Sequence, residues 1–300
     1  MQINFPPRST MRLTRRGKLV LAVAGAVLAG TAAAVPLLGP GDGHGEAKPP
    51  ALVVPDGWRA GQVYDAVDKA LALPAGSTRK SVGKAGLKLP NDAAGNPEGY
   101  LFPATYPLTR GVTPEALLGS MVDTANKRFG PAPVAAGAQR DGLNGYQTVI
   151  IASLVQAEAA AKADMGKVAR VVLNRLERGM PLQLDSTINY ALNRGAVRTS
   201  PDDTRIESDY NSYQRMGLPP TPIDNPGEDA LRAVLNAPPG DWLYFVTVKP
   251  GDTRFTADHA EHLRNMAEFD ALHPGTGRPG SPDPRRTAGS PRPVVTQPPR

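Results

Sequence analysis

The chain has no cysteine and few aromatic residues, and each shortage excludes a class of chemistry. Without cysteine there can be no disulfide, cysteine-ligated zinc, iron–sulfur cluster or thiol nucleophile. Aromatic residues make up 5% of the 300 residues, which is too few to favour stacking on nucleic-acid bases. The sequence also contains no GxSxG, HExxH or Walker motif, so it carries no signature of a serine hydrolase, a zinc protease or a nucleotide-binding loop.

The positive charge of the chain lies at its two ends. The formal net charge is +6 and the pI is 9.6, but residues 1–18 carry +5 and residues 273–300 carry +4. Residues 19–272 therefore carry −3. A surface that binds nucleic acid needs clustered cations on the folded part of the protein. We therefore expect that nucleic acid is not a partner.

Residues 19–38, LVLAVAGAVLAGTAAAVPLL, contain no charged side chain. A stretch of about 20 apolar residues is long enough to cross a bilayer as a helix. The basic residues between positions 12 and 18 favour a cytoplasmic N-terminus. The small residues at 32–34 leave a cleaved signal peptide as the alternative, although the apolar run is long for one. We expect a single-pass protein of the cell membrane with its folded part outside the cytoplasm.

The composition places the folded part between residues 51 and 272. Residues 39–50 have the composition of a flexible linker, and residues 273–300, with eight prolines, that of a disordered tail. Strands or extended segments are predicted at 51–55, 99–108 and 242–248. Helices are predicted at 61–73, from Thr113-Pro114 onward, at 147–162, 167–178, 228–236 and 258–269. Because helices and strands do not alternate regularly, the predicted fold class is α+β.

An acidic residue interrupts the apolar side of the predicted helix 147–162. Glu158 follows Ile151 by seven residues, so the two lie on the same side of the helix. A carboxylate in an apolar setting is costly unless it is paired or protonated, and burial raises the pKa of a glutamic acid. A glutamic acid that keeps its proton near neutral pH can act as a general acid. The alternative is a structural glutamate paired with Arg170 or Arg175.

A second group of candidates lies in polar, proline-rich segments between 181 and 227. Such side chains can stack on a sugar and form hydrogen bonds with it, although a surface loop stiffened by proline is the alternative for each one taken singly. The candidates for substrate binding are Asp185, Thr187, Tyr210, Asn211, Tyr213 and Asn225.

Two histidines three residues apart, His259 and His262, could contact one metal ion. Zinc sites in proteins normally use three or four protein ligands, and no further ligand is evident near this pair in the sequence. A capping or packing role therefore fits the two histidines better. We predict no metal site and no organic cofactor.

Five motifs and a closing Glu261-His262 pair occur in a fixed order along the chain. The motifs are EGYLFPATYPL (98–108), IIASLVQAEA (150–159), VARVVLNRLERGMPLQLDSTINYAL (168–192), YNSYQRMGLPPTPIDNPG (210–227) and WLYFV (242–246). Together they resemble the MltG-type, or YceG-like, family of endolytic murein transglycosylases. The resemblance covers roughly residues 97–265.

The resemblance implies an activity and a site. The family cleaves peptidoglycan glycan strands between MurNAc and GlcNAc without water, leaving 1,6-anhydroMurNAc ends, and its catalytic glutamate matches Glu158. The same carboxyl would act first as acid and then as base. The implied partners are peptidoglycan glycan strands, the cytoplasmic membrane and, through the family role in ending strand growth, cell-wall synthases.

The sequence departs from the family pattern at three places. Gln156 stands where the family has the first acid of its helix motif, and Thr253-Arg254-Phe255 lacks the family's histidine before the phenylalanine. Residues 51–96 resemble a shortened LysM-like region ahead of a catalytic domain at 97–272. These departures keep two alternatives open: a catalytically weak scaffold that binds peptidoglycan, and a hydrolytic muramidase.

Overall fold

The computed structural model describes residues 50–130, 142–195 and 198–273. Helices and strands both occur in these residues, which is consistent with the predicted α+β class. The predicted anchor at 19–38, nearly all of the linker, and the tail beyond His273 lie outside the described residues. Within the described ranges, no helix has the length and apolar character needed to span a membrane.

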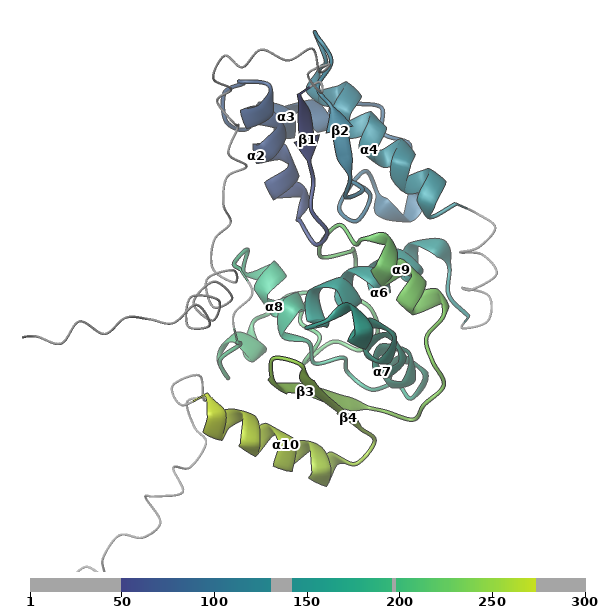
Figure 1. The fold of residues 1–300 in the computed structure, drawn as a ribbon, viewed down its shortest axis with the longest axis vertical. Coiled ribbons are helices and arrows are strands. Elements are labelled where there is room, and N and C mark those ends of the chain that lie inside the picture. The colour runs from purple at the N-terminus through teal and green to yellow at the C-terminus, as the bar shows by residue number, and fades with distance from the viewer. Residues whose placement is uncertain (1–49, 131–141, 196–197, 274–300) are drawn as a thin grey trace, which may run out of the picture. The chain divides into compact units, whose positions relative to one another are not determined.

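The first part of the fold pairs two short strands and packs three helices near them (Figure 1). Strand β1 (Ala51–Val53) pairs with β2 (Thr105–Pro107) in antiparallel fashion, with Leu52 opposite Tyr106. Strand β1 precedes the predicted domain boundary between residues 96 and 97, and β2 follows it, so the pairing joins the two sides of this boundary. The boundary itself stays a prediction. The intervening and following elements are α2 (Ala60–Ala70), α3 (Ser77–Ser81), η1 (Val82–Lys84), η2 (Asn91–Ala93) and α4 (Pro114–Arg128).

The second part surrounds one central helix, α6 (Gly145–Glu158), which contacts α7, α8 and α9 (Figure 1). A hairpin of two strands, β3 and β4, follows these helices, and α10 packs against it. The bounds are η3 (Lys162–Asp164), α7 (Met165–Glu177), α8 (Asp185–Ala191), η4 (Asp203–Arg205), α9 (Glu228–Leu235), β3 (Tyr244–Lys249), β4 (Asp252–Thr256) and α10 (His259–Leu272).

The predicted helices and strands are confirmed with shifted ends, and one strand was missed. Thr113 caps α4 as predicted, its Oγ1 accepting a hydrogen bond from the backbone N–H of Ala116. The predicted helix 147–162 ends four residues early, because Ala159 is extended with φ −74° and ψ 118°. Strand β4 was not predicted; the chain reverses into it at Pro250-Gly251, where Gly251 has a φ of +82° that favours glycine.

Helix α6 is buried around nearly its whole circumference. Its first turn is closed by a capping box in which the side chains of Asn144 and Gln147 each accept the other's backbone N–H. Every residue from Thr148 to Val155 is buried. The predicted apolar side is buried, and burial extends around the rest of the helix, so α6 is a core helix rather than an amphipathic surface helix. The position of Glu158 follows instead from its place at the end of the helix.

Gly99 lets the chain pass close to the proline-rich loop that follows residue 217. It has a φ of +85°, and a Cβ at this position would lie 2.5 Å from Cγ of Pro222 and 3.1 Å from Cγ1 of Val149. Both the backbone conformation and the close approach therefore require glycine. The packing fixes this loop against the central helix.

Two buried acids lie where the first and second parts of the fold meet. Glu98 is 4% exposed and accepts hydrogen bonds from the backbone N–H of Ala60 at 2.8 Å and from the Tyr190 hydroxyl at 3.2 Å. Burial raises the pKa of Glu98 to about 7, and the hydrogen bonds oppose this effect only in part. Burial likewise raises the pKa of Asp224 well above its usual value, and the nearby Glu98 adds to that rise.

We predict that Glu98→Gln flattens the dependence of stability on pH. Since the pKa of Glu98 is about 7 in the folded state against 4.5 ordinarily, its contribution to stability is present below pH 4.5 and is lost as the pH rises through 7. The difference corresponds to about 3 kcal/mol. The free energy of unfolding, measured by denaturant titration from pH 4 to 8, should fall less steeply in the variant.

The raised pKa of Asp224 also makes the free energy of unfolding fall as the pH rises, and Asp224 remains in the variant. The dependence of stability on pH should therefore be reduced rather than abolished. Glu207→Gln is the matched control, because Glu207 is exposed. Equal slopes for Glu98→Gln and the wild type would contradict the prediction.

Candidate functional site

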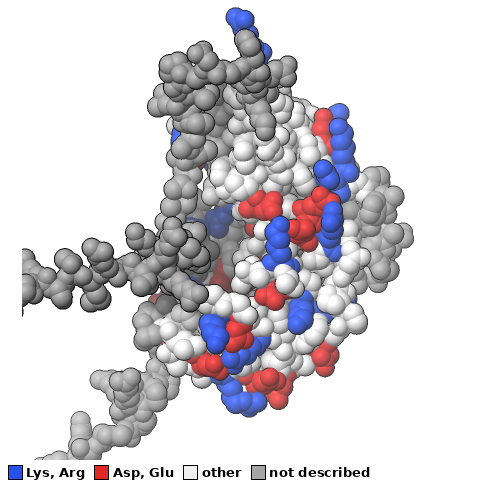
Figure 2. Space-filling view, viewed as in Figure 1, with Lys and Arg blue, Asp and Glu red and all other residues white. Residues whose placement is uncertain are grey.

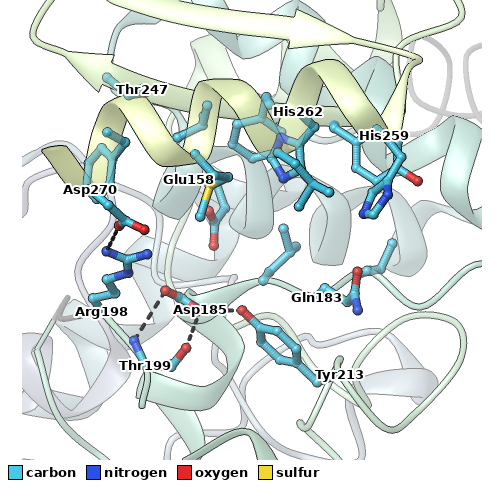
Figure 3. Close-up of a pocket in the computed structure, with 18 of the residues that line it drawn as sticks. Glu158, Gln183, Asp185, Arg198, Thr199, Tyr213, Thr247, His259, His262 and Asp270 are labelled. Atoms are coloured by element: carbon cyan, nitrogen blue, oxygen red, sulfur yellow. Dashed lines mark hydrogen bonds and ion pairs between the residues drawn. The ribbon is translucent and has the colours of Figure 1, made fainter. Parts of the chain in front are cut away.

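A cavity of about 720 Å³ opens between the end of α6, the start of α8, strand β3 and helix α10. In the view of Figure 3, α10 runs along one side with His259 and His262, while Gln183, Asp185 and Tyr213 lie on the other. The lining is mixed: it contains carboxylates, imidazoles and aromatic rings beside the apolar side chains of α10. Such a cavity is large enough for sugar rings, which present both C–H faces and hydroxyl groups.

Glu158 is the last residue of α6, and its side chain reaches the cavity. Its Oε1 accepts a hydrogen bond from the backbone N–H of Ser186, in the first turn of α8, at 3.2 Å. Burial is the largest cause that raises the pKa of Glu158; hydrogen bonding from Ser186 lowers it, and the negative charge of Asp185 raises it again. The carboxyl therefore releases its proton less readily than an exposed glutamic acid, which suits a general acid.

Neither arginine proposed as a structural partner forms an ion pair with Glu158. Arg175 donates from Nε to the Leu243 carbonyl at 2.6 Å and from Nη1 to the Leu182 carbonyl at 2.8 Å. Arg170 donates to the carbonyls of residues 237 and 238. The alternative of a structural Glu158–arginine pair is therefore wrong, because both guanidinium groups are used to hold backbone carbonyls.

Asp185 and Tyr213, two of the predicted substrate-binding residues, line the cavity together. The Tyr213 hydroxyl donates to Oδ1 of Asp185, and Thr199 donates to the same carboxylate through its hydroxyl and its backbone N–H. Figure 3 shows these bonds as dashed lines around Asp185. The three donors hold the carboxylate in one orientation at the edge of the cavity.

The other four predicted substrate-binding residues do not line the cavity. Thr187, Asn211 and Asn225 are fully buried, and their side chains donate to backbone carbonyls. The half-buried Tyr210 has its hydroxyl 2.9 Å from that of Thr221. These polar side chains hold the loops next to the site, and their role in substrate binding stays a prediction.

Residues of α7, β3 and α10 complete the lining and were not predicted as site residues. They include Arg175, Tyr244, His259, His262, Met266 and Phe269. The WLYFV motif and the closing Glu261-His262 pair could have indicated Tyr244 and His262 as site residues. From the sequence alone, the histidines were instead assigned to capping or packing. Gln156, two residues before Glu158, turns away from the cavity and accepts the backbone N–H of Gly227 at 3.2 Å.

Charge of both signs is present on the outer surface drawn in Figure 2. On the face drawn in Figure 2, basic and acidic side chains are interspersed rather than gathered into one field. Exposed ion pairs join several of them, among them Arg128 with Glu228 at 3.1 Å and Lys162 with Asp229 at 2.6 Å. The face drawn there therefore carries no broad field of one sign.

The fold is of the mixed helix-and-sheet class. Its cavity contains an acid at the end of a buried helix. The chain belongs to the YceG-like family, whose match extends over residues 32–268.

Two curated relatives are each 37% identical to this chain over the residues that align. It is 37% identical over 173 residues to the endolytic murein transglycosylase of Bacillus subtilis (strain 168), covering 57% of this chain and 48% of that protein. It is 37% identical over 177 residues to the endolytic murein transglycosylase of Streptococcus pneumoniae serotype 2 (strain D39), covering 57% of this chain and 32% of that one. The chain thus spans less than half the length of these relatives.

A solved structure shares the fold. A crystal structure of a yceG-like protein from Listeria monocytogenes superposes with a TM-score of 0.62 at 27% identity. The similarity covers 72% of this chain and 75% of that one.

We predict that Asp185→Asn lowers the pKa of the Glu158 carboxyl. The substitution removes a negative charge that raises this pKa, while burial, the larger cause, remains. The pKa should therefore fall but stay above that of an exposed glutamic acid, as measured by NMR titration of protein labelled with ¹³C at the glutamate carboxyls. Asp270→Asn is the control, since Asp270 lines the same cavity but is paired with Arg198. An unchanged or higher pKa in Asp185→Asn would count against this account.

Proposed function

We propose that the protein is a membrane-anchored lytic transglycosylase. It cleaves the MurNAc–GlcNAc bonds of nascent peptidoglycan strands within the strand, leaves 1,6-anhydroMurNAc ends and so terminates strand elongation. The observation that carries the proposal is the Glu158 carboxyl, which lies in a cavity of sugar size with a raised pKa. Family membership and the names of the curated relatives support the same activity.

One carboxyl is sufficient for the proposed reaction. Protonated Glu158 gives its proton to the glycosidic oxygen as the C1–O bond breaks, and the GlcNAc-containing fragment leaves with that proton. The sugar that remains has oxocarbenium character at C1. The Glu158 carboxylate then removes the proton from the C6 hydroxyl of the same MurNAc, and O6 bonds to C1. The nucleophile belongs to the substrate, which gives it a large effective concentration.

The state of the other acids in the cavity favours this reaction over hydrolysis. A glycoside hydrolase uses a second carboxylate as base or nucleophile. Asp185 already accepts hydrogen bonds from Tyr213 and Thr199, and Asp270 is paired with Arg198 at 2.7 Å. Glu158, by contrast, is held by Ser186 and forms no ion pair within the described residues.

We predict that Glu158→Gln abolishes cleavage and keeps the fold. The amide can still accept the Ser186 N–H but cannot transfer the proton, so the release of anhydro-muropeptides should fall by about 10²–10⁴-fold. The measurement is mass analysis of the products that the full-length protein releases from purified peptidoglycan. Glu207→Gln, which changes an exposed glutamate, should keep full activity.

The outcomes separate the proposal from its alternatives. Products with reducing ends would identify a hydrolytic muramidase. Binding to peptidoglycan without release of any product would identify a scaffold. Full activity in Glu158→Gln would remove this residue from the mechanism.

The uncharged stretch at 19–38, with the basic residues before it, supports an uncleaved membrane anchor. Anchoring would hold the cavity close to the membrane, where cell-wall synthases produce new strands and are proposed as partners. We predict that the full-length protein stays in the membrane fraction after a high-salt or carbonate wash, with its intact mass. A variant starting at residue 39 should appear in the supernatant, and recovery of the full-length protein there would refute the anchor.

A further inference from the structure

His262 lies in the same cavity as Glu158, on the opposite side from Asp185 in the view of Figure 3. It is the fourth residue of α10, and its ring stacks on that of Tyr244 in β3, with centroids 5.0 Å apart and planes 20° apart. The guanidinium of Arg175 lies over the Tyr244 ring, 5.1 Å from its centroid. The imidazole thus belongs to a packed column and keeps one orientation.

Helix α10 is held to the hairpin by charged and polar contacts. Arg254 of β4 donates to Glu268 at 2.6 Å and to Asn265 at 3.1 Å. The hydroxyl of Thr256 donates to Glu261 at 2.7 Å. His262 lies one position after Glu261, so these contacts fix the part of α10 that carries the imidazole.

Two polar residues of the cavity lining, Asp185 and Arg175, have hydrogen-bond partners in the protein, whereas His262 has none among the described residues. Asp185 is bonded to Tyr213 and Thr199, and Arg175 is bonded to backbone carbonyls. Within the described residues, Nδ1 of His262 is buried without a hydrogen-bond partner. The other ring nitrogen, Nε2, is not among the buried unpaired atoms and also has no protein partner, so it remains available to a ligand in the cavity.

The surroundings determine which nitrogen carries the proton. Burial lowers the pKa of His262, and the positive charge of Arg175 and the neighbouring His259 lower it further. The neutral ring has one N–H, and a buried N–H without an acceptor is costly. The proton therefore belongs on Nε2, which makes that atom a hydrogen-bond donor directed at the cavity.

We propose that Nε2–H of His262 donates a hydrogen bond to an uncharged oxygen of the MurNAc residue and orients this sugar so that its C6 hydroxyl, rather than water, reaches C1. This inference rests on the proposed lytic function. A neutral donor suits a hydroxyl or acetamido oxygen. It also adds no positive charge that would lower the pKa of Glu158 and so weaken it as a general acid. Water attack requires no particular orientation of the C6 hydroxyl, so a loosely held sugar would be hydrolysed more often.

The test compares two substitutions of His262 in the full-length protein. His262→Phe keeps a ring that can stack on Tyr244 but removes the donor, whereas His262→Gln keeps an N–H donor at similar reach. We expect His262→Phe to lose about 3- to 10-fold in rate and to release a larger fraction of reducing ends relative to anhydro ends. His262→Gln should return the product ratio towards that of the wild type. Arg264→Gln, on the same helix but at an exposed residue outside the cavity lining, is the control.

A purely structural role would lower the rate and the melting temperature together without changing the product ratio. An unchanged ratio in a folded, active His262→Phe enzyme therefore overturns the inference and leaves the proposed function standing.

A binding measurement keeps the inference testable if the wild type releases no anhydro ends, an outcome that would refute the proposed function. Glu158→Gln protein labelled with ¹⁵N-histidine is titrated with peptide-free glycan strands, and the His262 resonances are assigned by comparison with the double variant carrying His262→Phe. We expect the Nε2–H tautomer in the free protein and a shift of Nε2 when glycan is added. A shift supports the contact with the sugar, and an unmoved Nε2 resonance overturns it.

Discussion

A helix buried on all sides can present a polar group to solvent only at its ends, and this constraint places the acid of the site. Helix α6 fills the centre of the second part of the fold, and residues Thr148 to Val155 are buried. Its last residue, Glu158, leaves the core just where the backbone turns extended at Ala159. The backbone N–H of Ser186, in the first turn of α8, donates a hydrogen bond to the carboxyl there. The acid therefore lies between an apolar core and a polar cavity, which accounts for both its raised pKa and its access to a ligand.

The opposite wall of the cavity depends on polar contacts rather than on the core. Helix α7 holds the segment 237–243 through side chains that donate to backbone carbonyls: Arg170, Asn174 and Arg175. This segment leads directly into β3, so the same contacts set the position of Tyr244 and, through it, of the imidazole stacked on its ring. Backbone carbonyls that have no sheet partner must be satisfied in another way. Here the side chains of α7 donate the hydrogen bonds that these carbonyls accept.

Local signals in the sequence were sufficient for most elements but not for the site. The cap at Thr113 and the apolar run before Glu158 determine helices by short-range interactions, and both helices are present. The end of α6 had no such signal, because residues 159–162 are alanines and a lysine that favour helix. Asn225 in a proline-rich loop resembled a ligand-binding residue, yet its amide bonds to the backbone of distant segments. Contacts of this range depend on tertiary packing, which one sequence does not reveal.

Helix α8 connects the acid of the cavity with the first part of the fold. Its second residue, Ser186, donates to Glu158, and its sixth, Tyr190, donates to the buried Glu98 at 3.2 Å. Arg59, just before α2, stacks on the Tyr190 ring at 5.1 Å from the centroid. A helix of seven residues has little stability of its own, so its position is set by these two ends. Arg59, in the segment that precedes the predicted catalytic domain, thus contacts the helix whose N–H holds Glu158.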